Sequence, residues 1–90
     1  MFNIEKYEGK VPSNLLQSLV AYGKKEHSVG SFLGHVLENN LFEALCRADP
    51  ESLAAIKDIC MFVHWEMPSQ CHGSKENVRK WIQEIHSKAR

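Results

Sequence analysis

Apolar residues recur at helical spacing through most of the sequence, and this spacing restricts the chain to an all-α fold. The clearest series falls between residues 32 and 48, where apolar side chains return every three or four positions and form one stripe along a helix. Its members are Phe32, Leu33, Val36, Leu37, Leu41, Ala44, Leu45 and Ala48. We therefore predict one amphipathic helix over residues 32–48. Asn39 and Asn40 interrupt its stripe with amides, which are either structural or line a pocket between subunits.

Prolines, a glycine and a capping serine set the ends of three further helices. Pro12 suits the first position of a helix, and Gly23 suits the residue that ends it. Pro50 begins another helix, which Pro68 closes, and Ser74 caps the last one. The apolar sides of these helices contain Leu15, Leu16, Leu19 and Val20, then Leu53, Ile56, Ile59, Cys60 and Val63, and finally Val78, Trp81, Ile82 and Ile85. We expect about four helices, the middle two forming an antiparallel hairpin.

Size and charge limit the partners of this chain. We interpret residues 1–90 as one small helical domain with an N-terminal arm over residues 1–11. A monomer of this size buries only part of its apolar surface, so we expect a homo-oligomer. Eleven basic and eleven acidic side chains balance, and the net charge needed for general nucleic-acid binding is therefore absent. Because no apolar run approaches the roughly 20 residues of a membrane span, we also expect no membrane partner.

The cysteines indicate a reducing compartment. Cys46, Cys60 and Cys71 are odd in number and widely spaced. Residues 1–10 mix charges instead of forming the apolar core of a signal peptide. We expect free thiols and a cytoplasmic protein.

The stretch from Lys24 to Leu37 places cations and hydroxyls just before a helix. Free backbone N–H groups at a helix start attract anions, so the stretch suggests a phosphate cradle beside an aromatic ring that stacks on a base. The ligand-binding candidates are Tyr22, Lys24, Lys25, Ser28, Gly30 and Ser31. In the alternative interpretation, Ser28 or Ser31 only caps the helix, which is a common role of serine, and the lysines are solvated.

The helix that begins at Pro50 carries more apolar surface than one neighbouring helix covers. Phe62, Trp65 and Met67 widen its face beyond the main stripe, and such a surplus can contact a second subunit or another protein. We predict these three as interface residues. Trp65 is also a candidate for stacking on a ligand, because it lies off the stripe beside His64.

Metal binding and catalysis find little support in the residue pattern. Cys60 and His64 lie four positions apart and precede Cys71 and His72, so zinc is one interpretation of this set. Adjacent Cys71 and His72 seldom reach one tetrahedral centre, and Cys60 falls inside an apolar stripe, which favours a buried structural thiol. The chain has no local signature of a catalytic cysteine or of a carboxylate pair. We predict a non-enzymatic protein without metal or cofactor.

A longer pattern joins several of these residues. Its most specific parts are GSFL at residues 30–33, RAD at residues 47–49, and GS at residues 73–74 followed by Trp81. The pattern covers residues 11–82 and resembles a widespread family of small bacteriophage proteins. The chain departs from that family mainly at residues 26–29, inside the stretch interpreted as an anion cradle.

The resemblance implies a phage protein that acts in the cytoplasm of an infected bacterium. Small helical phage proteins of this size look like the oligomeric sponges that phages use against CBASS immunity, which hold cyclic oligonucleotide signals at subunit interfaces. By this analogy, the chain sequesters a small phosphate-bearing ligand, a cyclic di- or trinucleotide, as a homo-oligomer. Tyr22 would stack on a base, and Lys24 or Lys25 would pair with phosphate. Arg47 would reach the ligand from a neighbouring subunit.

A second function also fits the sequence. The wide apolar face that contains Phe62, Trp65 and Met67 is typical of surfaces that bind another protein. In this alternative, the chain is an interaction module that inhibits or redirects a host protein.

Overall fold

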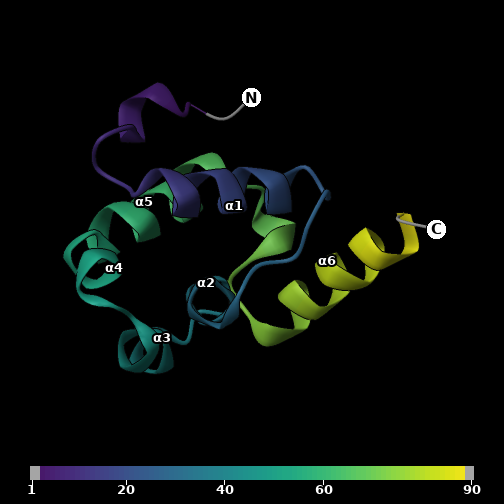
Figure 1. The fold of residues 1–90 in the computed structure, drawn as a ribbon. Coiled ribbons are helices and arrows are strands. Elements are labelled where there is room, and N and C mark those ends of the chain that lie inside the picture. Colours follow the sequence, from purple (N-terminus) through teal and green to yellow (C-terminus); the bar gives the residue numbers. More distant parts are fainter. Residues whose placement is uncertain (1–2, 89–90) are drawn as a thin grey trace.

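The computed structural model describes residues 3–88, with the side chain of Lys88 left out. Within this range the chain forms six α-helices and two short 3-10 helices, and no strand (Figure 1). They are η1 (Glu5–Tyr7), α1 (Ser13–Gly23), α2 (Ser31–Leu37), α3 (Leu41–Arg47), α4 (Pro50–Ala54), α5 (Ile56–Glu66), η2 (Ser69–Cys71) and α6 (Lys75–Lys88). The Cα radius of gyration is 12.2 Å, the size of one globular domain of this length. The predicted all-α fold is confirmed.

Local signals placed most helix ends correctly. α1 ends at Gly23, as predicted. The Asp49 carboxylate accepts a hydrogen bond from the Ser52 N–H at 2.7 Å and caps α4, and Pro50 occupies the first helical position. The Ser74 hydroxyl accepts a hydrogen bond from the Asn77 N–H at 3.1 Å at the start of α6. No helix in residues 3–88 is long and apolar enough to cross a membrane.

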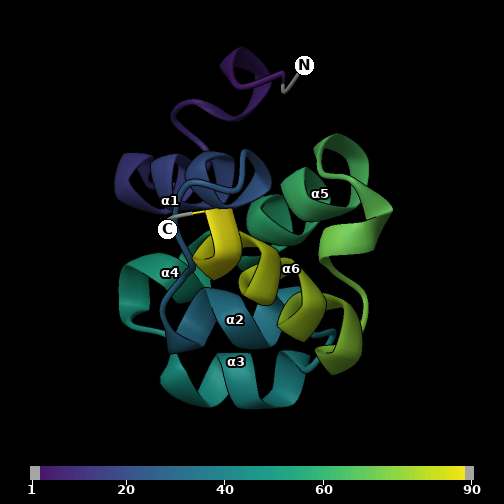
Figure 2. The same ribbon diagram turned by 90° about the vertical axis from the view of Figure 1, so that its right-hand side faces the viewer.

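The prediction of one helix over residues 32–48 is wrong, because the chain reverses between α2 and α3. Asn39 adopts a left-handed conformation with φ of 64°, which asparagine tolerates better than most residues at a helix end. The Asn40 side chain then accepts a hydrogen bond from the Glu43 N–H at 3.4 Å and caps α3. α2 and α3 consequently lie side by side as an antiparallel pair (Figure 2). The hairpin thus forms within the predicted second helix.

The predicted helix over residues 50–67 is likewise divided. At Ala55 the backbone turns to φ of −101° and ψ of 6°, and the Ala55 N–H bonds to the Ser52 carbonyl at 3.2 Å. α4 therefore ends after five residues and α5 continues in another direction. Alanine is the best helix former, so the sequence carries no local sign of this turn.

The core also contains part of the predicted N-terminal arm. Tyr7 and Val11 are each 3% exposed, and the ring of Tyr7 packs edge-on against Phe62 with the ring centres 5.0 Å apart. Phe62 is fully buried and Met67 is buried, so the prediction that these two residues face a second subunit is wrong. They belong to the core because α5 is covered by the arm as well as by other helices. Trp65, the third predicted interface residue, is 64% exposed.

Candidate functional site

Tyr22 does not have the predicted role of a stacking surface for a base. Its side chain is fully buried, and its hydroxyl donates a hydrogen bond to the carbonyl of Cys71 at 2.7 Å. Burial raises the pKa of this hydroxyl, and the neighbouring Cys71 and Glu38 raise it further. Tyr22 joins the end of α1 to the η2 turn, so its ring is part of the core.

Lys25 also joins parts of the fold together. Its Nζ lies 4.4 Å from the centre of the Trp81 ring and forms an ion pair with Glu84 of α6. The Trp81 Nε1 donates a hydrogen bond to the Tyr22 carbonyl at 2.7 Å. These contacts of Lys25 and Trp81 hold α6 against the C-terminal end of α1. Of the predicted ligand-binding residues, Tyr22 and Lys25 are therefore brought together at Trp81.

The remaining candidates lie on the surface. Lys24, Ser28, Gly30 and Ser31 are exposed. Gly30 is the N-cap of α2, and no side-chain hydrogen bond caps this helix, so the alternative role of Ser28 or Ser31 as a cap is not found either. α2 has seven residues, which limits the dipole that its N-terminus presents to an anion. Arg47 is exposed at the end of α3.

A recess adjoins Lys25. It has a volume of about 640 Å³ and is lined by Lys25, Ser69, Gln70, Asn77, Lys80, Trp81 and Glu84. Its two lysines are already paired with carboxylates, Lys25 with Glu84 and Lys80 with Glu76 at 3.2 Å. The recess therefore offers an indole and two amides in a nearly neutral setting.

The zinc set considered from the sequence does not converge. Within residues 3–88, no three side chains of His, Cys, Asp or Glu gather closely enough to hold a metal ion. Burial raises the pKa of the Cys71 thiol to about 12 and also raises that of Cys60, so both remain protonated at neutral pH. The ring of His64 packs edge-on against Trp65, with centres 4.6 Å apart.

A larger groove runs along α1. Its volume is about 780 Å³, within the range of small-molecule and peptide pockets. α1 supplies the floor through residues three or four positions apart, including Leu16 and Val20. Val11 and its neighbours in the arm form one wall, and Ala54 and Ala55 at the end of α4 form the other. Three segments that are separate in sequence thus build one groove, with apolar side chains from each of them.

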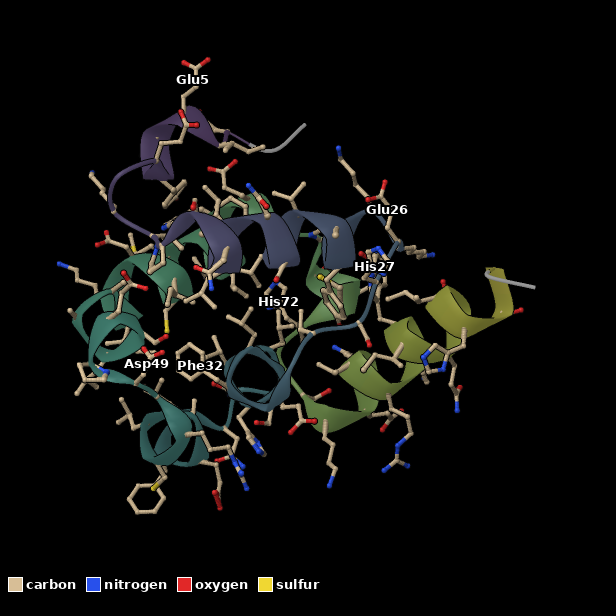
Figure 3. The ribbon with its side chains drawn as sticks, viewed as in Figure 1. Glu5, Glu26, His27, Phe32, Asp49 and His72 are labelled. Carbon is tan, nitrogen blue, oxygen red and sulfur yellow. The ribbon has the colours of Figure 1, made fainter. Side chains whose placement is uncertain are left out.

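The rim of this groove is acidic. Glu8, Glu26 and Glu51 line it, against one cation, Lys10. Figure 3 shows Glu26 just beyond the end of α1, so carboxylates stand at the arm, at the far end of α1 and on α4. A groove with an apolar floor and an excess of carboxylates favours an apolar ligand that carries positive charge.

Reasoning from the sequence missed this groove. Residues 1–11 show no apolar period, so nothing marked Val11 as a wall of a site. Glu26 lies in the stretch that the sequence analysis interprets as a phosphate cradle, and a carboxylate there would repel a phosphate. The spacing of Ser13, Leu16, Gln17 and Val20 was the one available sign, since it places them on one side of a helix.

Comparison with models of known protein families, with curated proteins and with solved structures finds no match. The function is therefore inferred from the surfaces of the molecule itself.

Proposed function

We propose that the protein is a non-catalytic binding module that holds a short basic and apolar segment of another protein in the α1 groove. The observation that carries this proposal is the combination of an apolar floor with Glu8, Glu26 and Glu51 on the rim. This is the alternative function considered from the sequence, moved from the predicted α5 face to the groove, because Phe62 and Met67 are buried.

The length of the groove favours a peptide. Its α1 floor extends from Ser13 to Ala21, which at a rise of 1.5 Å per residue is about 12 Å. About two turns of helix, or four residues of extended chain, span that distance. Glu26 lies beyond one end of this floor, and Glu8 and Lys10 line the groove from the arm. A basic residue at an end of the bound segment would therefore meet a carboxylate.

The test is a selection of short random peptides on the purified protein, followed by fluorescence anisotropy with the peptides recovered. We expect recovered peptides to combine apolar residues with Lys or Arg. Ala54→Phe places a ring in the groove from an exposed position and should abolish their binding. Ser18→Phe, on an exposed position of α1 outside the groove, is the matched control and should retain it. Recovery of acidic peptides, or binding that survives Ala54→Phe, would contradict the proposal.

Sequence resemblance alone supports the biological setting. We propose that the protein is phage-encoded, acts in the bacterial cytoplasm, and inhibits or redirects a host protein through the bound segment. We also propose that it self-associates, since a domain of this size leaves large apolar side chains exposed, among them Phe42 and Trp65.

Sequestration of a cyclic oligonucleotide is the second candidate function. The observation that favours it is the recess in which Trp81 lies beside Lys25 and Lys80, since an indole can stack on a base. Calorimetric titration with cyclic di- and trinucleotides, with the recovered ligand checked for integrity, tests it. Tight binding of an intact ligand that Lys80→Ala weakens would support this candidate, and absence of heat across the panel would exclude it.

A further inference from the structure

The turn that ends α1 places a carboxylate at one end of the groove. The Glu26 N–H donates a hydrogen bond to the Ala21 carbonyl at 2.8 Å, and the Lys25 N–H donates to the Tyr22 carbonyl at 3.0 Å. Lys25 has a left-handed φ of 62°, so these two bonds form a Schellman motif, which folds the following residue back over the last turn of the helix. Glu26 is therefore held beside Ala21, and both residues line the groove.

A charged residue is unusual at the position of Glu26. The corresponding residue of a Schellman motif frequently packs an apolar side chain on the helix that it follows. Here the residue is an exposed glutamate, and none of the ion pairs among the described side chains includes it. A carboxylate in place of a local packing contact indicates a role in binding rather than in folding.

The other two carboxylates of the rim are partly offset by their surroundings. Glu8 shares the arm wall with Lys10, which lines the same groove. Glu51 lies in the first turn of α4, where free N–H groups carry a partial positive charge. Glu26 instead follows the C-terminal end of α1, where the last carbonyls add to its negative charge.

The two lysines next to Glu26 lie outside the groove lining. Lys25 pairs with Glu84 and lines the recess beside Trp81. Lys24 is exposed and is not among the residues that line the groove, and a solvated lysine of this kind interacts weakly with a neighbouring carboxylate. The negative potential of the groove is therefore strongest at the Glu26 end.

We infer that Glu26 is the specificity-determining residue of the groove and receives a Lys or Arg side chain at one end of the bound segment. The apolar residues of the segment then lie over Leu16 and extend toward Val11 of the arm. This inference rests on the proposed function and deepens it, because it orients the bound segment along α1.

The test uses a peptide recovered by selection and a series in which each of its basic residues in turn is replaced by norleucine. Fluorescence anisotropy gives their affinities for the wild type and for variants whose helicity is checked by circular dichroism. Glu26→Gln should weaken binding of the parent peptide about tenfold or more, as expected for loss of a charge-assisted hydrogen bond. For one norleucine peptide, Glu26→Gln should cause no further loss, which identifies the basic residue that Glu26 receives.

Two variants serve as controls. Glu51→Gln should weaken the parent peptide less than Glu26→Gln does. Glu5→Gln removes an exposed carboxylate that lies on the arm, away from Glu26 and outside the groove lining (Figure 3), and it should retain the affinity.

Exchange of the charges gives the sharpest readout. Glu26→Lys should reject the parent peptide and should bind a peptide with Glu at the identified position more tightly than the wild type binds it. Glu51→Lys should not show this reversal, because Glu51 lies on another wall of the groove.

The outcomes separate this inference from the proposed function. Peptides that bind and are lost with Ala54→Phe, but lose no more affinity from Glu26→Gln than from Glu51→Gln, overturn the inference and leave the proposed function standing. A loss from Glu26→Gln that is equal for the parent and for every norleucine peptide also overturns it, since Glu26 would then act through the structure alone. Failure to recover any basic and apolar peptide overturns both.

Discussion

Replacing Tyr22 by phenylalanine tests the linkage between α1 and the η2 turn. Tyr22 is fully buried, and its hydroxyl donates to the Cys71 carbonyl at 2.7 Å, on a residue that is itself fully buried. Removing the hydroxyl leaves that carbonyl without this partner, in a place water does not reach. An unpaired buried group of this kind costs about 1–3 kcal/mol. For a domain of this size, each kcal/mol lowers the melting temperature by about 4–8 °C.

Tyr7→Phe is the matched control. Tyr7 is 3% exposed, and its hydroxyl forms no hydrogen bond with another of residues 3–88. Urea unfolding of both variants, followed by tryptophan fluorescence, gives the two free energies of unfolding. We expect Tyr22→Phe to lose at least about 1 kcal/mol more than Tyr7→Phe. Equal losses would refute the reasoning, because they would mean that the bond to Cys71 adds nothing to the removal of a tyrosine hydroxyl.

Three more predictions concern pH and local structure. Burial raises the pKa of Cys71 from 9.0 to about 12 and also raises that of Tyr22, so the folded state holds these protons more tightly. Stability should fall as the pH rises above about 9, and Cys71→Ala should flatten that fall between pH 9 and 12 in thermal melts. Asn39→Gly should keep the melting temperature and Asn39→Ala should lower it, because glycine accepts the left-handed conformation at this position and alanine is strained by it. Trp81→Phe should lower the free energy of unfolding, measured in urea, by about 1 kcal/mol or more, because it removes the hydrogen bond to the Tyr22 carbonyl and weakens the contact with Lys25. An unchanged free energy of unfolding would contradict that account.

The sequence predicts the helices better than their arrangement. Pro50 and Ser74 mark helix starts, because the preference of proline for the first helical position and the capping bond of serine depend only on a few neighbouring residues. Asn39 carries a partial signal for the reversal, since asparagine accepts a positive φ. The turn at Ala55 carries none. It depends on packing, and packing is decided by residues far away in the sequence.

The candidate site also combines features that local sequence patterns predict with features that depend on distant contacts. Tyr22 lies three positions after Leu19, so the period of α1 already indicated that its ring faces the core. Its interpretation as a ligand-binding residue gave more weight to the neighbouring lysines than to this spacing. The α1 groove required contacts between the arm, α1 and α4, which no local pattern encodes.

The buried arm has a consequence for the order in which the protein assembles. α2 and α3 are adjacent in sequence and contact each other, so their pairing closes only a short loop. Tyr7 contacts Phe62, which lies 55 positions later in the sequence, and this contact closes a long loop. We expect the arm to dock late in folding and to detach first in local unfolding. Because Val11 forms a wall of the groove, the capacity to bind a peptide would arise last and be lost before the helices melt.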